Sequence, residues 1–300
     1  SNPAHPAAYS IITRNYVTPP DVTGWTCNNG QYADEEMGTG WHPSPKVRLF
    51  SNDQSIRFEN PIHEIVETSL MDHGIRIQQC DIPIHHYGQL NRENYMAKGE
   101  EYYRLGKKKL AEKGEDLNAL IELATQAGGA FGKYEEAVDL WKRVLKIDPQ
   151  NTKALINMAS ALMRLQDYEA ARTSAKTAME QDSGLKEAII NYTTCEVLIG
   201  DSGKSIPILE DLLRKVPEYP LALALLASAY SIEGRKEEGL KPINHLKNMG
   251  FDCGYYLHDL STKLITTGKT ESALSLLEFA VKSGNGTTEI NDLLKRLVES

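Results

Sequence analysis

The hydrophobic positions of the first 90 residues follow short runs of the kind that form β-strands. Apolar residues alternate with polar ones, or cluster briefly, in residues 9–17, 46–50, 56–58 and 75–87. A period of two is typical of a strand that buries one face. Stretches rich in proline, glycine and threonine at 18–25 and 38–45 predict turns between these strands. The segment 60–70 fits either a loop that leads into a strand or a short helix.

The pattern changes to a helical period from about Asn91 onward. Eight of the 13 prolines and six of the eight histidines fall in the first 90 residues, which indicates a domain boundary there. We therefore expect a small α+β segment at 1–90 and a connecting helix at 91–117, in which acidic residues precede lysines at the spacing of helical ion pairs. The three lysines at 107–109 could instead form a phosphate-binding patch, but glutamates surround them.

A repeat with a period of 34 residues occupies most of the remaining chain. Related six-residue segments begin at Gly132, Gln166, Gly200, Gly234 and Gly268, without a gap. The fifth residue after each of these positions is small: Ala137, Ala171, Ser205, Gly239 and Ala273. Small side chains at a fixed position allow two helices to pack closely, so each repeat is predicted to be a helix, a tight turn and a second helix.

Residues 133–151, KYEEAVDLWKRVLKIDPQN, closely resemble the second helix and exit turn of the tetratricopeptide repeat (TPR). The resemblance covers about residues 118–285, in five copies that keep the same phase. It implies a mainly α fold: a TPR α-solenoid at 118–287 with a concave face lined by first helices, followed by a capping helix at 288–300. One helix pair cannot cover its own apolar face, so each pair is expected to bury it on the next.

The concave face implied by the resemblance is where a partner would bind. Asn157 and Asn191 occupy the same point on successive first helices, and we predict that they bind a protein or peptide segment together with Lys153. An amide side chain can donate to and accept from a peptide backbone. They could equally be ordinary polar surface residues. Glu122 and Glu187 stand where a carboxylate clamp would have lysines, which argues against a chaperone-tail adaptor.

Residues 9–112 resemble the C-terminal part of the catalytic domain in bacterial family 2 glycosyltransferases that carry TPR repeats. Three motifs follow one another in the order of that family: Arg48-Leu49-Phe50, then His63-Glu64, then His86-Tyr87-Gly88. A long helix and the repeats follow them. The resemblance implies that the α+β segment is the end of a GT-A glycosyltransferase domain.

The resemblance also implies roles for these residues. His63 and His86 would complete a Mn²⁺ or Mg²⁺ site, Glu64 would act as catalytic base or bind the acceptor, and Trp41 and Arg48 would contact substrate. A divalent cation neutralises the leaving diphosphate in transfer from a nucleotide-sugar, and a carboxylate takes the acceptor proton. In the alternative interpretation, His63 and Glu64 only hold a loop by hydrogen bonds.

An Asp-x-Asp metal motif, expected in the nucleotide-binding half of such an enzyme, does not occur in these 300 residues. We therefore expect the chain to be the C-terminal part of a metal-dependent glycosyltransferase, inactive alone and without a tightly bound cofactor, whose parent uses a nucleotide-sugar donor. The alternative is a non-catalytic TPR scaffold that binds a peptide or protein in its concave groove.

Composition narrows the class of protein further. The 300 residues are 41% hydrophobic and 25% charged, and 41 acidic against 33 basic side chains give a net charge of −8. An acidic chain is a poor ligand for nucleic acid, and no apolar stretch of about 18 residues is present that could span a membrane. The four cysteines are far apart and unlike a disulfide scaffold, so we expect a cytoplasmic location.

Overall fold

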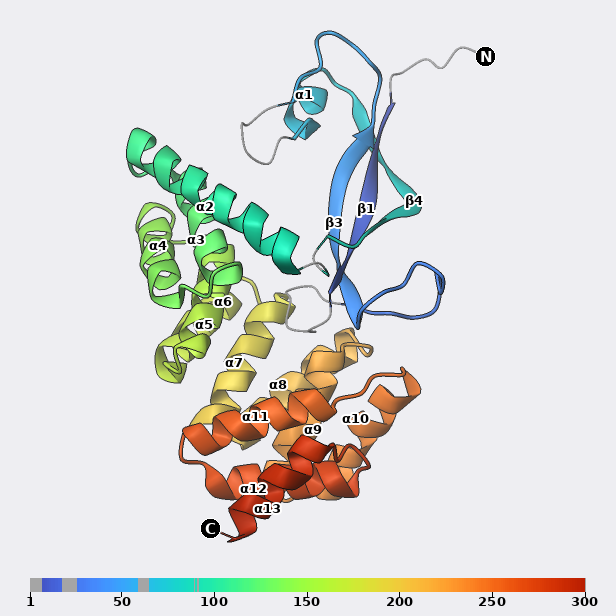
Figure 1. Ribbon diagram of the computed structural model, residues 1–300, viewed down its shortest axis with the longest axis vertical. Helices are drawn as coiled ribbons and strands as arrows, with labels where there is room; N and C mark the ends of the chain where they lie inside the picture. The colour runs from blue at the N-terminus through green and yellow to red at the C-terminus, as the bar shows by residue number, and fades with distance from the viewer. Residues whose placement is uncertain (1–6, 18–25, 59–64, 89, 91, 300) are drawn as a thin grey trace. The chain divides into compact units, whose positions relative to one another are not determined.

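The computed structural model in Figure 1 describes residues 7–17, 26–58, 65–88, 90 and 92–299. The chain forms two compact units, Ser1–Ala97 and Lys98–Ser300. The first contains the strands, and the second is helical.

The N-terminal unit is built on a four-stranded sheet with the order β2-β3-β1-β4. The strands are β1 (Ala7–Val17), β2 (Thr26–Cys27), β3 (Gly40–Leu49) and β4 (Arg76–His86). β1 is antiparallel to β3 and parallel to β4. The short helix α1 (Glu67–Asp72) precedes β4, and Val66 and Leu70 at this helix pack into a small core with Val47 of β3.

Two details of the predicted strands are wrong. β3 begins at Gly40, inside the stretch predicted to be a turn, because Pro43 and Pro45 pair with Arg14 and Ile12 of β1. A proline has no N–H to donate to a neighbouring strand, and no described residue pairs with these two positions on the other side of β3. Residues 56–58 form no strand; Ile56 instead points into the small core.

The C-terminal unit begins within α2 (Arg92–Lys113), which lies in the predicted connecting helix, and continues as five helix pairs. The pairs are α3 (Leu117–Gly129) with α4 (Tyr134–Ile147), α5 (Thr152–Arg164) with α6 (Tyr168–Gln181), α7 (Lys186–Ile199) with α8 (Ser202–Lys215), α9 (Pro220–Ile232) with α10 (Lys236–Asn248), and α11 (Gly254–Thr266) with α12 (Thr270–Lys282). A last helix, α13 (Thr288–Glu299), packs on α12. The described helices confirm the repeated helix pairs predicted by the 34-residue period.

Close packing explains the small residue in each repeat. Ala137, Ala171, Ser205 and Ala273 have no exposed surface, and Gly239 is buried too. A side-chain carbon on Gly239 would lie 3.1 Å from the Phe279 ring and from the Ala227 carbonyl oxygen. Any larger side chain would therefore push the neighbouring helices apart.

The fifth pair departs from the regular stacking. In the first four pairs the second helix of one pair packs against the first helix of the next: α4 on α5, α6 on α7 and α8 on α9. α11 makes little contact with α10, and α12 packs against α9 instead. Ser231 of α9 donates a hydrogen bond to the Ser275 carbonyl oxygen at 3.1 Å, and Ser275 of α12 donates one to the Ser231 carbonyl oxygen at 2.8 Å.

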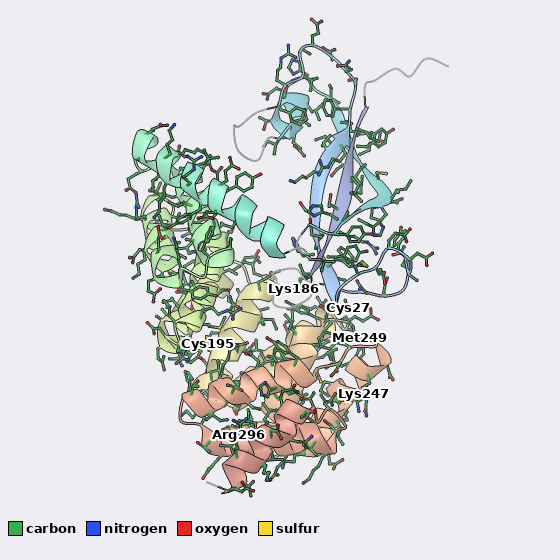
Figure 2. All side chains as sticks on the ribbon, viewed as in Figure 1. Cys27, Lys186, Cys195, Lys247, Met249 and Arg296 are labelled. Atoms are coloured by element: carbon green, nitrogen blue, oxygen red, sulfur yellow. The ribbon has the colours of Figure 1, made fainter. Side chains whose placement is uncertain are left out.

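The turn after α10 accounts for this change of direction. α4, α6 and α8 each end in an extended residue, as at Asp148 (φ −129°, ψ 87°). α10 ends instead in Gly250, whose φ is +72°, and the Phe251 N–H returns to the Leu246 carbonyl oxygen at 2.9 Å. A glycine in the left-handed conformation with this returning bond is a typical helix ending, and it turns the chain sharply. Figure 2 marks this end of α10 with Lys247 and Met249.

Replacing Gly250 with alanine is expected to lower the free energy of unfolding by about 1 kcal/mol, because a residue with a Cβ is strained at positive φ. No atom lies within 4 Å of the added carbon, so the loss comes from the backbone alone. The midpoint of urea unfolding measures it. Gly129→Ala is the control, since Gly129 also has open space but no positive φ; equal midpoints for the two variants would contradict the turn's role.

Candidate functional site

The first helices of successive pairs present equivalent residues on the same side. Residues four apart on a helix lie on the same side, and residues 34 apart occupy equivalent places in successive pairs. We call the face made by four such sets the inner face: Glu122 and Gln126 of α3 with Ala130 just after it; Ile156, Ser160 and Arg164 of α5; Ile190, Thr194 and Leu198 of α7; Ala224, Ser228 and Ile232 of α9.

The inner face becomes more buried along the array. On α5, Ile156 is buried, but Ser160 is half-buried and Arg164 is exposed. On α7, Leu198 is only 1% exposed, and on α9 both Ala224 and Ser228 have no exposed surface. The side chains become smaller or more apolar where another element covers them.

The fifth pair supplies that cover. The Tyr256 side chain of α11 lies beside the Thr194 side chain on the inner face of α7, and burial raises the pKa of the Tyr256 hydroxyl. Leu198 of α7 lines the same cavity as Thr266 at the end of α11 and Lys269 beside α12. α12 covers α9 through the reciprocal bonds of Ser231 and Ser275. The inner face is therefore largely buried from Leu198 of α7 to Ser228 of α9.

α2 closes the other end of the inner face. Lys109 of α2 forms an ion pair with Glu122 of α3 at 2.9 Å, and Gly99 approaches Ala130 so closely that a side-chain carbon on the glycine would lie 3.1 Å away. The other two lysines of the 107–109 run also have acidic partners, Glu136 at 3.2 Å and Glu112 at 3.8 Å. All three are thus neutralised, which favours the interpretation of α2 as a packed connecting helix over a phosphate-binding patch.

The accessible stretch between these two covers is centred on α5. We call it the α5 patch; its members are Gln126, Lys153, Asn157, Ser160 and Lys186. Figure 2 labels Lys186 at the start of α7. Lys153 and Lys186 are exposed, and the other three are half-buried. The first helices α3, α5 and α7 lie side by side, so these side chains belong to one continuous surface.

The two predicted asparagines occupy different surroundings. Asn191 is buried, at 9% exposure, and its amide nitrogen donates to the Ile156 carbonyl oxygen and the Ser160 hydroxyl, both at 3.2 Å. It joins α7 to α5. Asn157 is accessible, and its amide nitrogen donates to the Lys153 carbonyl oxygen in its own helix at 2.8 Å. A peptide-binding role for both stays a prediction, but only Asn157 offers an accessible amide.

The residues assigned to a transferase site lie in the N-terminal unit, and the structure describes only some of them. His63 and Glu64 lie outside the described residues. His86 is exposed near the end of β4, where its Nδ1 lies 3.0 Å from the Asn15 side-chain oxygen, and Arg48 is exposed on β3. Their metal, catalytic and substrate roles stay predictions.

Trp41 belongs to a cluster that sequence reasoning missed. The Arg14 guanidinium lies 4.5 Å from the Trp41 ring centroid and 4.6 Å from that of Tyr32, with an ion pair to Glu36 at 3.7 Å and a hydrogen bond to Gln31 at 2.9 Å. Stacking of this kind gives the Trp41 ring a neighbour within the protein. Arg14 is a charged residue in the middle of a mostly apolar predicted strand, and this feature of the sequence could have indicated the cluster.

Two further observations apply to the described residues alone. They contain no group of three or more histidine, cysteine, aspartate or glutamate side chains arranged to hold a metal ion. Among them, no helix has both the length and the apolar character needed to cross a membrane.

Comparison with known proteins identifies the helical repeats. Residues 130–188, which include α4, α5 and α6, match the tetratricopeptide repeat family. Similar solved structures include MamA (18% identity, 54% of this chain and 94% of that one, TM-score 0.49) and a TPR protein from Parabacteroides merdae (16%, 77% and 89%, 0.49). A third is YrrB, described as a TPR protein with an unusual peptide-binding site (16%, 63% and 97%, 0.45).

Residues 130–188 therefore match the tetratricopeptide repeat, within a mostly helical fold. No curated protein sequence matches the chain. The matching family model is that of the tetratricopeptide repeat, and it lends no support to a glycosyltransferase origin of residues 9–112.

Replacing Asn191 with alanine is expected to lower the free energy of unfolding by about 1–2 kcal/mol, because a buried amide that bonds two partners is lost. Asn157→Ala should change it by less than about 0.5 kcal/mol, since that side chain bonds only its own helix. Urea unfolding of the two variants measures the difference. Equal losses would show that the two asparagines have the same structural role.

Proposed function

We propose that this protein is a TPR scaffold that binds an extended segment of a partner protein on the α5 patch. The observation that carries the proposal is a contrast between equivalent positions: Asn157 and Ser160 of α5 stay partly accessible, whereas Leu225 and Ser228 of α9 are buried. A polar surface that the other described residues leave accessible is available to a ligand.

The chemistry of the patch suits a peptide backbone. The amide nitrogen of Asn157 is held by the Lys153 carbonyl oxygen, which leaves the side-chain oxygen as an acceptor for a peptide N–H. The Ser160 hydroxyl donates to the Ile156 carbonyl oxygen at 3.2 Å and accepts from the Asn191 amide nitrogen at 3.2 Å, which leaves one acceptor lone pair for a ligand. Polar groups on adjacent rigid helices are held in fixed positions, which reduces the entropy lost on binding.

Transfer chemistry is not part of the proposal. The roles of His63 and Glu64 rest on a resemblance alone, and neither residue is among those that the structure describes. The TPR match supports the scaffold interpretation instead.

Selection from a displayed library of random 12-residue peptides tests the proposal on the full chain. Peptides enriched on the wild-type protein are expected to bind the double variant Lys153→Glu/Asn157→Ala at least tenfold more weakly, because the variant loses a cation and the accessible amide. Fluorescence anisotropy with the labelled peptides measures the affinities.

Lys241→Glu provides the matched control, since Lys241 is an exposed lysine on the second helix α10 with no ion pair among the described residues. It should leave binding unchanged. Failure to enrich any peptide, or equal binding by the wild type and the double variant, would overturn the proposed function.

A further inference from the structure

The α5 patch is bounded on both sides by contacts within the protein. On the α3 side, the 2.9 Å ion pair between Lys109 and Glu122 occupies the inner face. On the α7 side, Tyr256 of α11 lies beside Thr194, and a side-chain carbon on Gly200, just after α7, would lie 2.9 Å from the Lys269 amino nitrogen of the fifth pair. A ligand therefore meets a covered surface in each direction along the array.

The cover on the α7 side is part of the hydrophobic core. Leu257, Leu260 and Leu264 of α11 are at most 2% exposed and belong to one cluster with Val197 and Leu198 of α7. Lifting α11 would expose all of these side chains to water at once. A peptide that offers mostly backbone hydrogen bonds cannot compensate for that exposure, so the fifth pair acts as a fixed boundary.

The spacing of helices sets the length of segment that fits. Neighbouring helices lie roughly 8–10 Å apart, so three first helices, α3, α5 and the start of α7, span about 16–20 Å. An extended chain advances about 3.3 Å per residue. The patch therefore accommodates about six residues.

The charge of the patch indicates which residues the segment contains. Lys153 and Lys186 form no ion pair with any described residue, although all three lysines at 107–109 are paired. The Lys186 amino nitrogen lies 5.5 Å from the centroid of the Tyr219 ring. Glu187 follows Lys186 on α7, so Lys153, Lys186 and Glu187 together carry a net charge of +1. The whole chain has a net charge of −8. A carboxylate on the ligand would pair with the unpartnered Lys153.

We infer that the partner of this protein presents a short extended segment, about six residues long, that contains at least one aspartate or glutamate, because the fifth helix pair and α2 close the inner face on either side of α5. The inference rests on the proposed function, since it specifies the ligand of the same patch. The ligand expected here is therefore shorter than a peptide that would bind along the whole length of the array.

Truncation of the selected 12-residue peptides tests the length. Each peptide is shortened from either end, and its affinity for the full wild-type chain is measured by anisotropy. We expect a core of about six residues to retain affinity within threefold of the parent peptide. A tenfold or greater loss on trimming to eight residues would overturn the inference, because the ligand would then extend beyond the patch.

A second selection tests the charge. The same random library is selected on Lys153→Glu, and the cores are compared with those from the wild type and from Lys241→Glu. Wild-type and control cores should contain aspartate or glutamate, and Lys153→Glu should favour lysine or arginine in the same place. Cores without a carboxylate, or unchanged by the substitution, would overturn the inference while leaving peptide binding intact. If no peptide is enriched at all, the proposed function and this inference fail together.

Discussion

The arrangement of the C-terminal unit depends on covering α9 on every side. This helix, PLALALLASAYSI, is apolar all round, and its residues from Ala222 to Ser231 are buried. An ordinary first helix in such an array buries one stripe and leaves the other to solvent. α8 and α10 cover only part of α9, so a further element must cover the rest. α12 does so, and this requires the chain to turn away from regular stacking at Gly250.

The same constraint decides which part of the inner face stays accessible. With α12 packed on α9 and Tyr256 of α11 beside Thr194 of α7, Leu198 of α7 and Ala224 and Ser228 of α9 are buried. The polar stretch that remains is centred on α5, within the residues that match the TPR family. Core packing at one end of the array thus limits the surface that can serve recognition at the other.

Much of this fold could be predicted from the sequence, because the 34-residue spacing of small and apolar residues fixes the helix pairs. The reversal of the fifth pair could not, since the period continues without a gap through NMGFDCG and only the left-handed Gly250 redirects the chain. Asn157 and Asn191 were equivalent by spacing, but burial distinguishes them. In the N-terminal unit, β3 was predicted too short because its prolines resemble a turn until the pairing with β1 is known.

The packing of α12 on α9 is the central claim, and a disulfide tests it most directly. In the full chain carrying Ser231→Cys and Ser275→Cys, mild oxidation followed by peptide mass mapping reports whether the two thiols are adjacent. The reciprocal hydrogen bonds at 3.1 and 2.8 Å predict a near-complete disulfide between these two positions. A chain that stays reduced there while its core remains folded would contradict the account and indicate that the fifth pair continues the regular array.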